Sequence, residues 1–141
     1  MPFENPGRDR IKAILEEASN IAVVGLSDKT DRTSHMVASA MQDRGYRIIP
    51  VNPNAAEILG QTCYPKLADI PEPVDIVNVF RRSEEVLPIA EQAVAIKAKV
   101  FWLQQGIYNE EAANLCLEHG IEVIMDRCIK VEDAITRPNR G

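Results

Sequence analysis

Residues 21–34 read Ile-Ala-Val-Val-Gly-Leu-Ser-Asp-Lys-Thr-Asp-Arg-Thr-Ser. The apolar run at their start has the length of a short buried strand, and Gly25 within it allows a tight turn and a close approach of another backbone. A polar loop follows, and Thr33 or Ser34 can cap a helix that begins there. Strand, glycine turn and helix in this order predict the first half of a βαβ unit.

Further apolar runs are spaced along the rest of the chain. They predict strands at 46–51, 74–80, 99–103 and 121–125, and helices near 11–18, 33–45, 83–94 and 109–120. Their β-branched residues are continuous rather than alternating, which is typical of strands covered on both faces. Helices of about 10–15 residues between strands indicate right-handed crossovers and a parallel sheet.

The sequence therefore predicts an α/β fold, a single Rossmann-like, doubly wound domain over residues 1–141. We expect a mainly parallel five-stranded sheet flanked by helices, a loop with short helical turns between 52 and 73, and a frayed tail over about 136–141.

Composition limits the partners that we expect. The net charge of -5 argues against nucleic acid, and no apolar run is long enough to cross a membrane. The N-terminus lacks the pattern of a signal peptide. The three cysteines are far apart and show no CxxC spacing, which favours reduced thiols over disulfides or a metal site. These features predict a cytoplasmic protein without a metal.

The loop at 25–34 has the groups of a phosphate site. In an open parallel sheet, ligands bind outside the carboxyl ends of the strands. Ser27 and Ser34 offer hydroxyl groups there, Lys29 and Arg32 add positive charge, and a helix start offers free N–H groups. An ordinary capped helix with solvated charges would show the same residues, so the loop alone leaves both readings open.

A second basic group, Phe80-Arg81-Arg82, follows the strand predicted at 74–80. Phe80 suits a ribose or adenine and an arginine suits a phosphate monoester, although arginines also simply keep a strand end soluble. A nucleotide with a pyrophosphate and a separate ribose phosphate would use both basic groups, and coenzyme A and NADP both fit. An NAD fingerprint is absent, because Ser27 stands where its second glycine would be and Asn52 where an acidic residue would be.

Several segments together resemble the bacterial and archaeal CoA-binding protein family, which is similar in fold to the CoA-binding domain of the succinyl-CoA synthetase α subunit. They are 23–27, 32–34, 50–53, 79–82, 100–107 and 125–128. The resemblance implies a site for coenzyme A with the pyrophosphate near the loop at 25–34. It implies phosphate contacts from Gly25, Ser27, Lys29, Arg32 and Ser34. It also implies that Asn52 and Pro53 flank the pantetheine or ribose, that Phe80 and Arg81 hold the adenosine and its 3′-phosphate, and that Gln105 and Gly106 line the far side.

The sequence offers no catalytic pair beside these residues. His35 and His119 are expected to be structural, and no serine or cysteine motif accompanies them. Cys128 follows the last predicted strand and could meet the CoA thiol, although a small apolar role is commoner. We therefore expect binding of coenzyme A or an acyl-CoA without catalysis. The alternatives are an NADP-dependent or other nucleotide-using enzyme, and an interaction protein with a vestigial ligand loop.

Overall fold

A five-stranded parallel sheet forms the centre of the protein, whose structure is a computed structural model that describes residues 3–139. The strands follow the order β2-β1-β5-β6-β7. They are β1 (Asn20–Val24), β2 (Arg47–Val51), β5 (Ile76–Val79), β6 (Val100–Leu103) and β7 (Glu122–Ile124). The predicted α/β, Rossmann-like fold with its five-stranded parallel sheet is thereby confirmed.

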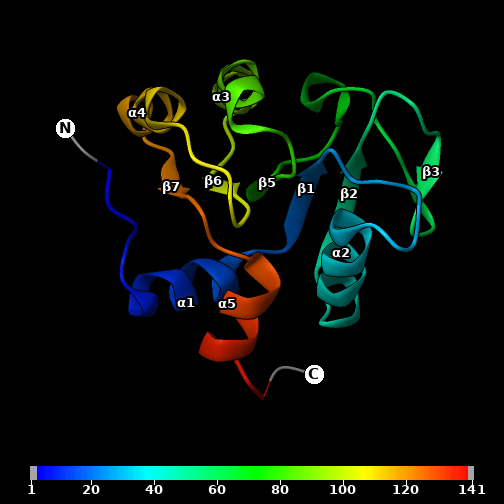
Figure 1. Cartoon of the computed structure of the whole chain (residues 1–141), viewed down its shortest axis with the longest axis horizontal. Helices are drawn as coiled ribbons and strands as arrows, with labels where there is room; N and C mark the ends of the chain where they lie inside the picture. The colour runs from blue at the N-terminus through cyan, green and yellow to red at the C-terminus, as the bar shows by residue number, and fades with distance from the viewer. Residues whose placement is uncertain (1–2, 140–141) are drawn as a thin grey trace.

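Helices cover both faces of the sheet (Figure 1). One face carries α1 (Arg8–Glu17), α2 (Thr33–Asp43) and α5 (Ile129–Thr136), and the other carries α3 (Val86–Ala95) and α4 (Glu110–Glu118). The neighbours Phe101 and Trp102 in β6 show why the strands are apolar throughout. Both side chains are fully buried, and they enter separate core clusters on opposite faces of the sheet. No helix within residues 3–139 is long and apolar enough to cross a membrane.

The strand order changes direction between β1 and β5. From β1 the chain crosses to β2 at the edge of the sheet, and it returns past β1 to form β5 on the other side. The loops that follow β1 and β5 therefore leave the sheet in opposite directions, which opens a crevice at the carboxyl ends of these strands.

The segment between 52 and 73 contains more order than the sequence predicts. Two short antiparallel strands, β3 (Glu57–Ile58) and β4 (Gln61–Thr62), form a hairpin, and a 3₁₀ turn follows at Leu67–Asp69. Leu59 and Gly60 turn the hairpin with φ angles of 55° and 73°. Strands of two residues are too short to show a periodic pattern, which is why they were not predicted.

The C-terminal segment forms α5, a helix that the sequence did not predict. Its Asp133 is fully buried, where it pairs with Arg44 and accepts a hydrogen bond from the Tyr46 hydroxyl at 2.7 Å. Part of the expected frayed tail is also ordered: Thr136 ends α5, and Arg137 donates to the Leu15 carbonyl at 2.7 Å. Residues 140–141 lie outside the described residues, so fraying there stays a prediction.

Candidate functional site

Gly25 brings the loops after β1 and β5 into contact. Its φ is 85°, and its N–H donates to the Val51 carbonyl at 3.0 Å. A Cβ at this position would lie 2.5 Å from the carbonyl oxygen of Phe80, closer than real side chains approach. A glycine is therefore required here for both its conformation and its lack of a side chain.

The loop from Ser27 to Ser34 is held by its own hydroxyl groups. Ser34 is buried, and its Oγ accepts a hydrogen bond from the Ser27 N–H at 3.0 Å, while the Ser27 Oγ accepts one from the Lys29 N–H at 3.1 Å. The predicted cap by Thr33 or Ser34 is wrong, because Arg32 occupies the N-cap position and makes no side-chain cap. The Ser34 hydroxyl instead accepts its hydrogen bond from the loop that precedes the helix. The first turn of α2 consequently has no side-chain cap, which leaves its N–H groups suited to an anion.

A cavity of about 450 Å³ lies over this loop. Its lining includes Gly25, Ser27, Lys29, Arg32, Thr33, Ser34 and Phe80. The Lys29 and Arg32 side chains are exposed. Within the part of the chain that the structure describes, residues 3–139, neither forms an ion pair. The cavity therefore combines hydroxyl groups, helix N–H groups and two cations, which is the chemistry of an anion site.

Arg81 and Arg82 share one carboxylate. Glu85 accepts from Arg81 Nη2 at 2.6 Å and from Arg82 Nε at 2.9 Å. These hydrogen bonds, from Arg81 and then Arg82, lower the pKa of Glu85. The Cδ of Arg81 would lie 3.0 Å from a Cβ on Gly25, so the stem of this arginine crosses the glycine. Arg81 thus lies beside the phosphate loop.

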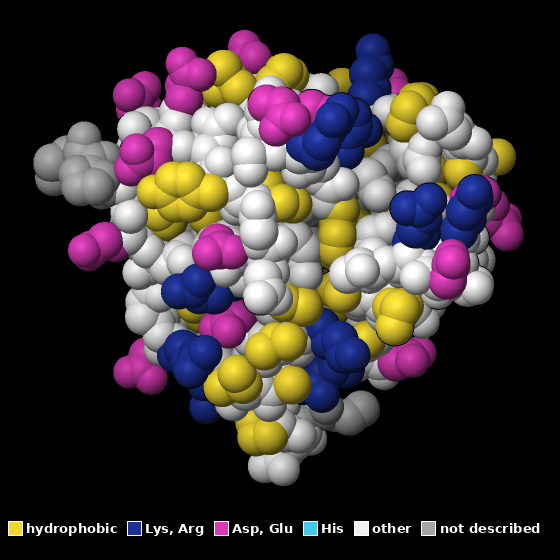
Figure 2. Space-filling model, in the orientation of Figure 1, with side chains coloured by type: hydrophobic (Ala, Val, Ile, Leu, Met, Phe, Trp, Pro, Cys, Tyr) yellow, Lys and Arg dark blue, Asp and Glu magenta, His cyan; other side chains and the backbone are white. Residues whose placement is uncertain are grey.

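A larger cavity of about 660 Å³ adjoins the first. It is lined by Thr33, Phe80, Arg81, Arg82, Ser83, Glu84, Gln104, Gln105, Gly106, Ile107 and Cys128. Thr33 and Phe80 line both cavities, so the two form one elongated surface along the carboxyl ends of the strands. Figure 2 shows Lys and Arg side chains at several places on one face of the molecule, with hydrophobic side chains visible in the hollowed area between those at the top and those at the right.

The structure brings together every predicted site residue except Asn52 and Pro53. Gly25, Ser27, Lys29, Arg32, Ser34, Phe80, Arg81, Gln105 and Gly106 line one cavity or both, and Asn52 and Pro53 line neither. Asn52 uses both ends of its amide within the protein: its Nδ2 donates to the Leu26 carbonyl at 2.9 Å, and its Oδ1 accepts from the Asn54 N–H at 2.8 Å. It therefore supports the loop after β1.

Gln104 and Asp126 support the site, although sequence reasoning assigned them no role. The buried Gln104 Oε1 accepts from the Ile129 N–H at 3.0 Å and from Asn78 Nδ2 at 3.3 Å, which fixes the start of α5 against β6. Asp126 Oδ1 accepts from the Gly106 N–H at 2.7 Å. Both positions follow predicted strands, but their partners could not be foreseen without α5 and the strand order.

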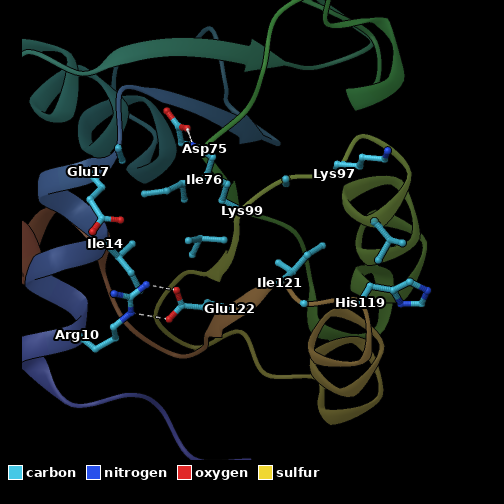
Figure 3. Close-up of a pocket in the computed structure, with 15 residues that line it drawn as sticks. Arg10, Ile14, Glu17, Asp75, Ile76, Lys97, Lys99, His119, Ile121 and Glu122 are labelled. Carbon is cyan, nitrogen blue, oxygen red and sulfur yellow. Dashed lines mark hydrogen bonds and ion pairs between the residues drawn. The ribbon is translucent and has the colours of Figure 1, made fainter.

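Another cavity of about 660 Å³ lies at the opposite, amino ends of the strands (Figure 3). Four of its charged side chains form two ion pairs: Arg10 binds Glu122 through two hydrogen bonds, one of 2.8 Å, and Lys99 lies 3.4 Å from Asp75. The Lys97 and His119 side chains lie on the side of the cavity away from α1 and point away from that helix (Figure 3). Within residues 3–139, two of the three Lys and Arg side chains that line this cavity are thus neutralised by a carboxylate, whereas Lys29 and Arg32 at the carboxyl ends have no such partner.

Asp75, which lines the cavity at the amino ends of the strands, should make the free energy of unfolding depend on pH. Burial raises its pKa, but hydrogen bonds from the Asn20 and Ser19 N–H groups, at 2.9 and 2.8 Å, and the charge of Lys99 produce a net lowering. A lowered pKa stabilises the fold above the ordinary value of about 3.9, and this stabilisation is lost as the pH falls through the lowered value. Asp75→Asn should cost about 1–2 kcal/mol near neutral pH. In thermal unfolding, its deficit should shrink on acidification; a deficit that is independent of pH would contradict this role.

Comparison with known proteins identifies relatives over most of the chain. The family model described as CoA binding domain matches residues 19–134. The uncharacterized protein YneT of Bacillus subtilis is 55% identical over 135 residues, covering 96% of this chain and 100% of the relative. The ADP-forming acetate–CoA ligase II of Archaeoglobus fulgidus is 37% identical over 116 residues, which are 74% of this chain but 17% of the ligase.

Solved structures show the same fold. A hypothetical protein from Pyrococcus horikoshii superposes with a TM-score of 0.90 at 34% identity, covering 96% of this chain and 99% of that one. A protein from Thermus thermophilus gives a TM-score of 0.89 at 34% identity, with 93% and 99% covered.

Proposed function

This chain belongs to the family of the CoA binding domain, and on that premise we propose that it binds coenzyme A or an acyl-CoA without catalysing a reaction of its own. The observation that carries the proposal is the pair of adjoining cavities at the carboxyl ends of the strands. One cavity has the groups that grip an anion, and the other provides room for the remainder of a long ligand.

The pyrophosphate of the ligand is assigned to the smaller cavity. There the uncapped N–H groups of α2 and the charges of Lys29 and Arg32 surround it, while Ser34 keeps the loop in place. Arg81 crosses Gly25 at the edge of this cavity, where it can reach the 3′-phosphate. A dianionic phosphate competes there with the single carboxylate of Glu85, and a guanidinium binds either group through paired hydrogen bonds.

The lining residues support binding rather than catalysis. No histidine lines either of the two cavities among the described residues. The carboxylate of Glu84 is largely exposed and lies 3.7 Å from Arg82. A nucleophile with an adjacent base, which covalent catalysis requires, is thus not assembled by these side chains.

Removing a cation of the phosphate loop should weaken the binding of coenzyme A. Arg32→Ala loses a charged contact worth about 1.5–3 kcal/mol, which corresponds to roughly a 10- to 100-fold weaker affinity. For the wild type, ligand at about 100 times its dissociation constant adds roughly 2.7 kcal/mol, seen as a rise in Tm on the order of 10 °C. Lys12→Ala, an exposed change on α1, is the matched control. An Arg32→Ala protein with the full wild-type rise would contradict the assigned site.

Arg81→Ala should selectively remove the contribution of the 3′-phosphate. In wild type, we expect coenzyme A to raise Tm more than dephospho-CoA does. In Arg81→Ala the two ligands should give equal rises, because the group that distinguishes them has lost its partner. Lys12→Ala, an exposed change on α1 that lines neither cavity, is the control and should preserve the difference. A difference that persists unchanged in Arg81→Ala would assign the 3′-phosphate elsewhere.

A further inference from the structure

The three cysteines differ in how accessible they are. Cys63 and Cys116 are buried, which raises the pKa of both thiols, that of Cys116 to about 12. Cys128 is partly exposed and lines the larger cavity together with Phe80 and Gly106. Of the three free thiols, Cys128 is therefore the one that a ligand in this cavity can reach.

Buried side chains fix the position of Cys128. It occupies the N-cap position of α5, and the residues on both sides of it are held by the end of β6. Trp102 Nε1 donates to the Arg127 carbonyl at 2.9 Å, and Gln104 Oε1 accepts from the Ile129 N–H at 3.0 Å. The hydrogen bonds on either side of Cys128 thus hold its backbone in the cavity wall, at the start of α5.

If the proposed function holds, the charges along the elongated surface indicate in which direction coenzyme A would lie. Lys29 and Arg32 have no ion-pair partner within residues 3–139, whereas Arg81 and Arg82 already share Glu85. The phosphates are therefore drawn to the smaller cavity and its edge. Thr33 and Phe80 line both cavities, so the uncharged pantetheine arm, which ends in the thiol, would then pass them into the larger cavity. Its end would lie on the side of Gly106 and Cys128.

We propose that Cys128 forms a mixed disulfide with coenzyme A by exchange with CoA disulfide. The Cys128 thiolate attacks one sulfur of the CoA disulfide, so that a protein–CoA disulfide bond forms and the original disulfide bond breaks. The second coenzyme A leaves as a thiolate and takes up a proton. One disulfide is consumed and one is formed, so the CoA disulfide is the only oxidant that the step needs. A free thiol reverses the reaction, and the site becomes a redox-sensitive store of coenzyme A.

Intact-mass spectrometry with CoA disulfide tests this inference. Wild type should gain one CoA adduct that dithiothreitol removes and that peptide mapping assigns to Cys128. Cys128→Ser should gain none, while Cys63→Ser and Cys116→Ser, at buried thiols, should behave as wild type. The reaction should be at least about ten-fold faster than with glutathione disulfide, since binding raises the effective concentration of the reagent at the thiol. Arg32→Ala should remove this advantage.

Three outcomes would overturn the inference: no adduct, adducts on Cys63 or Cys116, or equal rates with the two disulfides. Equal rates would show that Cys128 is an exposed thiol without site-directed reactivity. Thermal unfolding of wild type with reduced coenzyme A and dithiothreitol separates this failure from failure of the proposed function. A rise in Tm without adduct formation would leave the binding proposal in place, and no rise would remove both.

Discussion

Gly25→Ala should destabilise the fold by about 2–5 kcal/mol and abolish the binding of coenzyme A. A left-handed backbone costs a side-chain-bearing residue roughly 1–2 kcal/mol, and overpacking adds about 1–3 kcal/mol. Both apply, because φ is 85° and the new Cβ would lie 2.5 Å from the Phe80 carbonyl oxygen. That contact is to backbone, so it is relieved only if the loops after β1 and β5 move apart. Such a movement would also separate Arg81 from the phosphate loop.

Gly60→Ala provides the control for this prediction. Gly60 also has a positive φ, of 73°, but no atom lies within 4 Å of its Cβ position. Gly60→Ala should therefore lower the free energy of unfolding only by the cost of the left-handed backbone, about 1–2 kcal/mol. It should bind coenzyme A as wild type does. Urea unfolding followed by circular dichroism measures both losses. A Gly25→Ala protein as stable as Gly60→Ala, with normal binding, would show that the two loops are not fixed against each other.

Asp133→Ala should cost about 3–5 kcal/mol, because it removes one partner of a buried ion pair and leaves the other behind. The carboxylate of Asp133 is fully buried among Arg44, Tyr46 and Arg137. These partners lie on other elements or at the chain end, so the substitution detaches α5 from α2 and from the start of β2. Because Cys128 is the N-cap residue of α5, detachment of the helix should also increase hydrogen exchange at the cavity wall.

Asp43→Ala is the matched control for Asp133, since Asp43 is an exposed carboxylate at the end of α2. A surface change of this kind is expected to stay within about 0.5 kcal/mol of wild type. Denaturant unfolding of both variants gives the comparison. If Asp133→Ala proved as stable as Asp43→Ala, the ion-pair cluster would not be what holds the C-terminal helix.

The strands could be predicted because parallel strands that are buried on both faces leave a continuous apolar signal. In β6, Phe101 and Trp102 supply opposite faces of the sheet, so no polar residue interrupts the run. α5 gave no such signal. It is eight residues long and buries the charged Glu132 and Asp133. From the sequence alone, charged residues of this kind are expected to be exposed to solvent. Their burial depends on arginines distant in the chain, such as Arg8 and Arg44, whose contacts no local pattern contains.

The sequence was sufficient to predict which loops form the candidate site. Residues that directly follow parallel strands share one edge of the sheet, so Gly25, Phe80 and Gly106 were expected to meet. Which side chains face the cavities could not be predicted. Asn52 follows a strand as well, but its amide is bound to the Leu26 carbonyl. The sharing of Glu85 between two arginines likewise depends on the local turn after β5.

Isothermal titration of coenzyme A into the reduced wild-type protein, with NADP titrated in parallel, tests the central claim most directly. The proposed site predicts saturable one-to-one binding of coenzyme A, with weaker binding of dephospho-CoA and of NADP. An absence of binding by coenzyme A, or tighter binding of NADP, would contradict it.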